Sequence, residues 1–532
     1  MSRRTGVLSG AVLVGLLALS AGPAAAAPAQ SPAPAQSPAP SPAPAPGKPG
    51  ARAKTPVEHL VVLMQTGHSF DNYFGTFPGA DGIPAGVCQR PSVGQLTDKG
   101  CVAPFRLGSR PPEDLDHGRV AWRRQYNSGK MNGFLAAYRK QGRDGTTAMG
   151  YYDGEDLPFY WNVAARNVLF DRFFGSARSG SMLNHVFWVT GGPTPGGGEE
   201  APRGGYTAPT IFDRLRAAGV SWKFYVENYE PRTTFRTPGA GSRQGQLSKV
   251  PLLSYPRFVD DPKLRRHIVD AGQYYRDLES GTLPAVSYMV TAGSSEGPPG
   301  SPRAGQRLVH RMVSELAKSR YWSSSAFLWT YDGWGGWYDH VKPPQVDTYG
   351  YGFRVPAVLV SAYARRGHVD HTRLDYTSVL RFIEDNWDVR PLSTRDARAN
   401  SIAGAFDFSA PPRPAELVSF EAPSPAAPRV PSHVVYLLYG AALVGAAAAV
   451  TLAVGGRRRT PRAGSRPDPD LGPNGGRASD PGGGRASDPD RGRASDPDRS
   501  PSPDWDADSA RGRVPDDVEP VPVGVADREE GS

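Results

Sequence analysis

The sequence predicts an α/β fold with a central, mostly parallel sheet flanked by helices. Between residues 56 and 410, short apolar runs alternate with segments whose apolar residues recur at helical spacing. This alternation is typical of crossover connections between parallel strands. The segment is also long enough to bury the core of a large α/β domain. A third observation is that unusual positions follow two of the apolar runs, at the edge where such sheets bind ligands.

Eight elements are predicted inside residues 56–410. The expected strands are the apolar runs Leu60–Met64, Ser221–Val226, Ala285–Val290, Ala326–Tyr331 and Ala357–Ser361. The expected helices are Thr210–Ala218, which Gly219 would end, Gln306–Lys318, and a helix that runs from its N-cap Asp375 to Trp387. Each helix has apolar residues three and four positions apart, which predicts one buried face.

The N-terminal part has the pattern of a secretory signal peptide over residues 1–27. Arg3 and Arg4 precede an apolar run from Val7 to Leu19, and small residues follow at Ala24–Ala27. The alternative is an uncleaved anchor, but the run is short for a bilayer crossing. Residues 28–55 are rich in Pro, Ala and Ser, and this composition predicts an extended linker.

The C-terminal part predicts one transmembrane helix at 434–454. This segment is uncharged and apolar, and its length suits one bilayer crossing. Arg457, Arg458 and Arg459 follow at once and place that end in the cytoplasm. Residues 411–433 then form a linker, and residues 455–532 a low-complexity, disordered tail. A buried core helix is the alternative. We expect a single-pass cell-membrane protein with its large domain outside.

The net charge of +9 is spread along the chain, and only the arginines after the apolar segment form a tight basic cluster. Anionic lipid headgroups are sufficient to explain that cluster, so we expect no nucleic-acid partner. The two cysteines, Cys88 and Cys101, both lie in the expected external part. We expect them to pair in an oxidising compartment, and two cysteines alone do not form a zinc site.

Three motifs could contribute to catalysis. Tyr331–His340 places Asp332 after a strand, then a glycine-rich turn, then Asp339 and His340. Glycines let backbone approach a ligand closely. The alternative interpretation is a structural turn with a solvated His340.

The other two motifs are weaker by themselves. Ser179–His185 is typical of a loop that enters a helix, where the Ser181 hydroxyl could act on a phosphate. The alternative is that Ser181 only caps the helix. Asp116 and His117, taken alone, favour the interpretation of a surface pair.

These motifs belong to a longer resemblance that runs from Glu58 to Phe408. The chain resembles the bacterial phosphoesterase family that contains non-haemolytic phospholipases C and related acid phosphatases. The segments that carry the resemblance are His59–Gln65, Ser69–Gly75, Gly129–Phe134, Thr282–Ser287, Tyr321–Ser325, Gly335–Val341 and Gly352–Pro356. The resemblance implies an alkaline-phosphatase-like fold, a bound divalent metal ion, and a Ser or Thr nucleophile that attacks phosphorus.

The resemblance also implies roles for individual residues. Asp332 corresponds to a metal-binding carboxylate, and Asp339 is a second candidate ligand. Ser181 falls at the position of the nucleophile, while His117 and His340 correspond to positions near the catalytic site.

Four positions depart from the family pattern. Thr66 and Gly67 replace a Glu-Asn pair, Gly333 replaces a second acid, and Gly297 stands where many members have His. A hard cation needs several oxygen ligands, mainly carboxylates, so these changes would remove most of the metal site.

Two functions therefore stay open after the sequence. One is hydrolysis of phosphate esters, including phospholipid headgroups, with a divalent metal ion. The other is a catalytically inactive protein that acts as a cell-surface binding module, with no cofactor. A structural or adhesion role would suit the linker, but no motif supports it.

Overall fold

The computed structural model describes residues 51–421, apart from 96, 98, 111–112, 195–200, 238–241, 292–295 and 298–300, together with residue 445. The predicted signal peptide, most of the first linker, the predicted transmembrane segment except residue 445, and the tail lie outside the described residues. Within the described part, no helix has both the length and the apolar character needed to cross a bilayer. Those four assignments therefore stay predictions.

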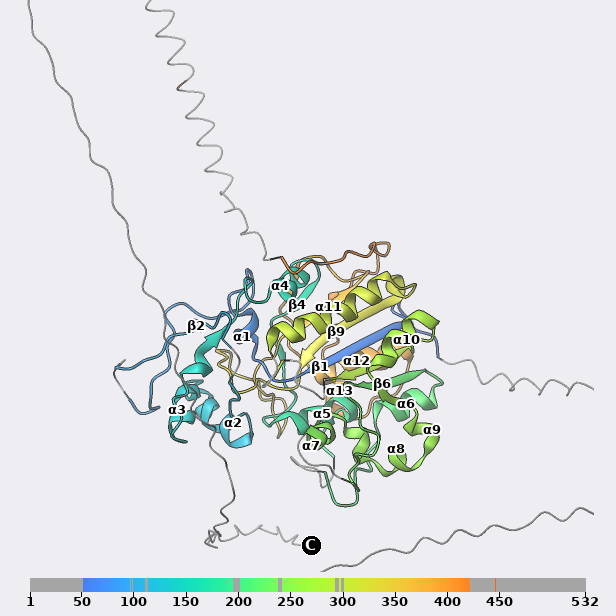
Figure 1. Ribbon diagram of the computed structural model, residues 1–532, viewed down its shortest axis with the longest axis horizontal. Helices are drawn as coiled ribbons and strands as arrows, with labels where there is room; N and C mark the ends of the chain where they lie inside the picture. Colours follow the sequence, from blue (N-terminus) through green and yellow to red (C-terminus); the bar gives the residue numbers. More distant parts are fainter. Residues whose placement is uncertain are drawn as a thin grey trace, which may run out of the picture. The chain divides into compact units, whose positions relative to one another are not determined.

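An eight-stranded sheet forms the centre of the domain (Figure 1). In spatial order its strands are β11 (His368–Asp370), β4 (Val168–Phe170), β10 (Ala357–Ser361), β9 (Ser325–Tyr331), β1 (His59–Gln65), β8 (Val286–Val290), β6 (Trp222–Val226) and β7 (Ile268–Asp270). Only β10 runs antiparallel to its neighbours. The predicted mostly parallel α/β sheet is confirmed.

Helices cover both faces of the sheet (Figure 1). One face carries α4 (Pro158–Ala164), α10 (Gly272–Ser280) and α11 (Pro302–Lys318). The other carries α5 (Ser181–Thr190), α6 (Ile211–Ala217) and α12 (Tyr376–Trp387). Because both faces are covered, strands such as β1 and β9 are buried along almost their whole length, which explains their continuous apolar sequences.

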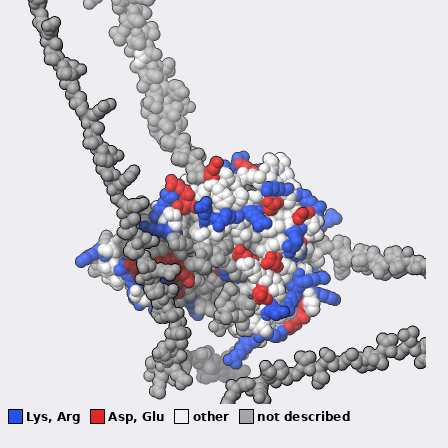
Figure 2. Space-filling model, viewed as in Figure 1, with Lys and Arg blue, Asp and Glu red and all other residues white. Residues whose placement is uncertain are grey.

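The remaining α-helices and strands of the described residues are short. They are the helices α1 (Phe70–Phe74), α2 (Arg119–Tyr126), α3 (Phe134–Arg139), α7 (Ser242–Lys249), α8 (Pro256–Asp260), α9 (Pro262–Arg265) and α13 (Thr394–Ala397), and the paired strands β2 (Phe105–Arg106) with β3 (Gly150–Tyr151) and β5 (Phe173–Phe174) with β12 (Leu374–Asp375). Cys88 and Cys101 form the predicted disulfide, which closes a loop before β2. Figure 2 shows basic and acidic side chains interspersed on the face drawn, and the lack of a nucleic-acid partner stays a prediction.

The eight predicted elements are all present with small shifts at their ends. The helix expected from Gln306 begins earlier, at Pro302, because the Ser301 side chain accepts a hydrogen bond from the Ala304 N–H and proline suits the first turn. Asp375 caps α12 as expected, through a reciprocal pair with Ser378. The short strands β4, β7 and β11 carry too few residues for periodicity to reveal them.

A buried ion-pair cluster joins three distant segments. The Arg354 guanidinium is fully buried and donates to Asp339 at 2.9 Å and to Asp71 at 2.9 Å. His340 donates to Asp71 through its main-chain N–H, and its ring nitrogen Nδ1 lies 2.8 Å from the same oxygen. Burial would lower the pKa of His340, but the hydrogen bond and charge of Asp71 outweigh it and raise that pKa. The cluster fixes the loop that follows β9 against α1.

We predict that Arg354→Met lowers the free energy of unfolding by about 3–5 kcal/mol, because Asp71 and Asp339 would stay buried without their counterion. Arg172→Met is the control, since Arg172 is about half exposed where it pairs with Asp81 and should contribute less than about 1 kcal/mol. Urea denaturation of both variants measures the difference. Equal effects of the two substitutions would contradict this account.

A second buried carboxylate lies beneath the end of β1. Glu296 accepts hydrogen bonds from Gln65 at 2.7 Å and from Tyr73 at 2.9 Å, and Tyr160 donates to it as well. Gly305 leaves the space for it, because a Cβ there would lie 1.9 Å from the Glu296 Oε1 atom. Burial raises the pKa of Glu296 to about 7.

This shift predicts a pH dependence of stability. The folded protein holds the Glu296 proton more tightly than the unfolded chain, whose carboxyl titrates near 4.5. The free energy of unfolding should therefore fall by up to roughly 3 kcal/mol as pH rises from 4.5 through 7. Glu296→Gln should remove this contribution, and the exposed Glu279→Gln should not. Denaturant titrations at several pH values test this, and parallel profiles for wild type and Glu296→Gln would refute it.

Candidate active site

Four adjacent parallel strands end at one edge of the sheet. Strands β9, β1, β8 and β6 are paired in register, so the residues that follow them lie side by side. These residues are Asp332, Thr66, Thr291 and Glu227. Ligands of open α/β sheets bind beyond the carboxyl ends of the strands, so this edge is the candidate site. The expectation that the departures at Thr66 and beside Asp332 share one edge is confirmed.

Asp332 is almost completely buried at this edge. Its Oδ1 atom accepts a hydrogen bond from the Gly67 N–H at 3.0 Å, and its main-chain carbonyl accepts one from Asn184 at 3.0 Å. Its Oδ2 atom has no hydrogen-bond partner among the described residues. An unpartnered buried carboxylate oxygen is costly unless a positive charge lies nearby.

Lys249, the last residue of α7, extends into this edge. Its ammonium group donates to the Thr66 hydroxyl at 2.8 Å and to the Thr291 carbonyl at 2.8 Å. Burial lowers the pKa of Lys249, while the charges of Asp332 and Glu227 act in the opposite direction. The ammonium is thus hydrogen-bonded to Thr66 and Thr291 and interacts electrostatically with Asp332 and Glu227. These are the residues that follow the four strands.

The backbone leaves no space for a side chain at Gly67, one of the four positions that depart from the family pattern. A Cβ atom on Gly67 would lie 2.7 Å from the Gly335 Cα atom, and one on Gly335 would lie 2.1 Å from the Gly67 carbonyl oxygen. An asparagine side chain at position 67 does not fit unless this loop moves. Gly333 differs, because a Cβ there would meet only the Asn184 side chain, at 4.0 Å. At Gly297, a Cβ would lie 3.0 Å from the Thr66 side chain.

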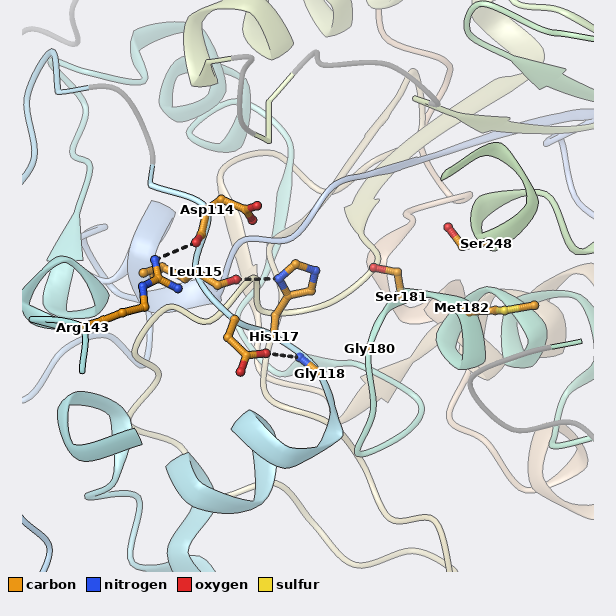
Figure 3. A pocket seen from close by; sticks show the side chains of 10 residues that line it. Asp114, Leu115, His117, Gly118, Arg143, Gly180, Ser181, Met182 and Ser248 are labelled. Carbon is orange, nitrogen blue, oxygen red and sulfur yellow. Dashed lines mark hydrogen bonds between the residues drawn. The ribbon is translucent and has the colours of Figure 1, made fainter. Parts of the chain in front are cut away.

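A cavity of about 530 Å³ opens beside this edge and is lined by both His117 and Ser181 (Figure 3). The His117 Nδ1 atom donates to the Leu115 carbonyl at 2.7 Å, which leaves Nε2 on the other side of the ring. In Figure 3, that side of the ring and the Ser181 hydroxyl point toward one another. Arg143 and Asp116 also line the cavity, so its wall carries both signs of charge.

Ser181 is the first residue of α5, and the cavity includes the start of that helix. Gly180 precedes it and provides no side-chain cap, so the first N–H groups of α5 have no side-chain acceptor from that residue. Such a helix start attracts anions. One turn further, the His185 ring lies 2.9 Å from the Ser181 carbonyl oxygen. Burial lowers the pKa of His185, against the effect of the Asp332 charge, so the ring tends to be neutral.

The residues at the strand ends do not fit a divalent metal ion. The Thr66 hydroxyl already accepts from an ammonium group, and Gly67 and Gly333 have no side chains to offer. Among the described residues, only Asp71, Asp339 and His340 form an acidic or histidine group close enough to share one ion. Their carboxylates are already bonded to the Arg354 guanidinium and to main-chain N–H groups.

The structure separates the predicted site residues into two groups. Ser181 and His117 line one cavity, and Asp332 lies at the strand ends near the first turns of α5. Asp339 and His340 belong instead to the Arg354 cluster and do not line that cavity.

Sequence reasoning missed Lys249 altogether. A single lysine at the end of a short polar helix carries no motif, and only the fold brings it to the strand ends. Asn184 lies within the recognised Ser179–His185 motif, but its bond to the Asp332 carbonyl was not predicted.

Comparisons with known proteins show which family this chain belongs to. Phospholipase C A of Mycobacterium tuberculosis is 27% identical over 417 residues, which cover 67% of this chain and 78% of that protein. A non-hemolytic phospholipase C of Pseudomonas aeruginosa is 28% identical over 418 residues, covering 67% of this chain and 58% of that protein. A solved alkaline phosphatase superfamily protein from Vibrio parahaemolyticus aligns at 11% identity and a TM-score of 0.32, over 63% of this chain and 67% of that one. The sequence model of the Phosphoesterase family matches residues 57–390, so this chain belongs to that family.

Proposed function

We propose that this protein binds phosphate esters, in particular phospholipid headgroups, in the His117–Ser181 cavity without metal-dependent hydrolysis. The observation that carries the proposal is the contrast between the two halves of the site. The cavity retains a hydroxyl and an imidazole at the start of α5, whereas the strand ends lack the ligands that a divalent ion needs. The groups of the cavity should give affinity for an anion, and the lack of metal ligands at the strand ends should remove turnover.

The cavity supplies groups that suit a phosphoryl oxygen. The N–H groups at the start of α5 and the Ser181 hydroxyl are hydrogen-bond donors. Arg143 also lines the wall, but its guanidinium is paired with Glu113 at 2.7 Å, so the helix start is the main anion-binding group. The named relatives are phospholipases C, which supports a phospholipid headgroup as the ligand class.

Loss of turnover follows from the missing metal ligands. In a metal-assisted phosphoryl transfer, the ion lowers the pKa of the attacking group and stabilises charge on the phosphoryl oxygens. In Figure 3 the Ser181 hydroxyl points toward the His117 imidazole, and Gly67 leaves no room for a ligand side chain.

The second candidate is hydrolysis that needs no metal. The mutual orientation of His117 and Ser181 favours it, because a neutral imidazole that faces a hydroxyl can act as a general base. Such a pair would still need donors that stabilise the pentavalent transition state, and the start of α5 is the candidate source.

We predict that the purified full-length protein binds inorganic phosphate and phosphatidylcholine vesicles in the presence of EDTA. Turnover of p-nitrophenyl phosphate should stay at background with or without Mn²⁺ or Ca²⁺. Ser181→Ala should weaken phosphate binding about tenfold, because it removes one hydrogen bond to a charged ligand. Calorimetry and a colorimetric phosphatase assay give the two readouts.

Ser280→Ala, on the exposed end of α10, is the matched control and should bind phosphate like the wild type. Metal-stimulated hydrolysis that Ser181→Ala abolishes would overturn the binding proposal. Hydrolysis that resists EDTA and depends on both His117 and Ser181 would establish the second candidate instead.

We also propose that the domain lies outside the cell membrane, tethered by the segment 434–454. The support comes from the sequence alone: the N-terminal signal pattern, and the apolar segment followed by arginines at 457–459. A phospholipid headgroup would then be within reach of the cavity.

Protease treatment of intact cells that express the full chain tests this orientation. We expect removal of the folded domain and survival of the C-terminal tail, detected with antibodies against each part. A digested tail together with a protected domain would reverse the assigned orientation.

A further inference from the structure

The crevice at the strand ends already contains one cation. The Lys249 ammonium lies 2.8 Å from the Thr66 hydroxyl and 2.8 Å from the Thr291 carbonyl, so it occupies the end of β1 and the end of β8 together. Asp332 and Glu227, at the ends of the flanking strands β9 and β6, add carboxylate charge on both sides. The ammonium therefore has two neutral oxygen acceptors and the charges of two carboxylates around it.

A second observation points to the same position independently. Asp332 is 1% exposed, and its Oδ2 atom has no hydrogen-bond partner among the described residues. The other oxygen is held by the Gly67 N–H, so the carboxylate is oriented rather than loose. A buried carboxylate of this kind needs a positive charge nearby. The Arg354 guanidinium is bonded to Asp71 and Asp339, and Lys249 is the cation at this edge whose charge acts on Asp332.

We propose that Lys249 is a built-in cation that takes the place of a divalent metal ion at the ends of β9, β1, β8 and β6. Its ammonium balances Asp332 and Glu227, and it excludes divalent ions from the crevice by charge and by its bond to Thr66. This inference deepens the proposed function, because it names the group that replaces the metal beside the cavity. It does not depend on phosphate binding and can be tested separately.

The chemistry of the two kinds of cation explains the local sequence. A divalent ion accepts electron pairs from oxygen ligands, so it requires carboxylates such as the family's Glu and second Asp. An ammonium group instead donates hydrogen bonds, and neutral acceptors such as a threonine hydroxyl and a main-chain carbonyl satisfy it. Thr66 is therefore a suitable partner for Lys249 and a poor ligand for a metal.

Removal of the ammonium should open the crevice to divalent ions. In Lys249→Met, the Asp332 carboxylate would lose the nearby charge of the ammonium and would attract Mn²⁺. Binding to the folded state alone raises the midpoint of thermal unfolding, by about 2 °C or more at millimolar Mn²⁺. The wild-type midpoint should not respond.

The experiment compares thermal unfolding of the full-length protein with and without MnCl₂. The variants are Lys249→Met and Lys249→Gln, since the amide of Gln can keep hydrogen bonds without charge if Met fails to fold. Each is also combined with Asp332→Asn, which should abolish the response. Lys223→Met is the matched control, because Lys223 pairs with the buried Asp277 at the other end of β6 and should create no Mn²⁺ response.

Two results would overturn the inference. One is a Mn²⁺ response of the wild type that Asp332→Asn removes, since an ion would then bind beside Lys249. The other is a Lys249→Gln variant that folds and responds no more than the wild type. Failure of the wild type to bind phosphate would count against the proposed function only, because the Mn²⁺ comparison does not involve phosphate.

Discussion

The in-register pairing of β1 with β9 and β8 is the constraint on which the rest of the site depends. Gln65 lies beside Tyr331 and Met64 beside Val290, so Thr66 leaves the sheet level with Asp332 and one residue beyond the level of Thr291. A slip of one residue in either pair would send alternate side chains to the opposite face of the sheet. The burial of β1 and β9 under helices on both faces prevents such a slip and makes this geometry rigid.

An ammonium group in place of a divalent ion changes what this rigid edge can do. At the same distance, a single charge gives half the Coulomb energy of a double charge, so attraction to a phosphoryl oxygen is weakened but retained. An ammonium group has no vacant coordination position, so it cannot bind a hydroxyl and lower its pKa as a metal ion does. An ammonium group in place of a metal ion therefore weakens catalysis more than it weakens anion binding. This is why we propose binding as the function.

The sequence predicted the fold better than the site, and the reason is physical. In long buried strands and amphipathic helices, the spacing of apolar residues reflects which side chains are buried. The sequence alone was therefore enough to recognise β1, β9 and α12. The role of Lys249 depends on the position of α7 relative to four strands, and no local pattern encodes it. Arg354 belongs to a recognised motif, yet its partners Asp71 and Asp339 are separated by 268 residues and meet only in the folded chain.

The contact between Gly67 and Gly335 bears on how the site reached its present form. If ligand side chains were merely absent, they would leave a space that new side chains could fill. Here the two backbones meet where a side chain at 67 would begin, and Lys249 occupies the neighbouring position. Contacts therefore link residues 66, 67 and 249 and the loop at 335. Substitutions at these positions should not have additive effects on metal affinity. Removal of the lysine alone should admit only the weak binding expected at millimolar Mn²⁺, and a tightly held metal ion would also require movement of the loop and new ligands.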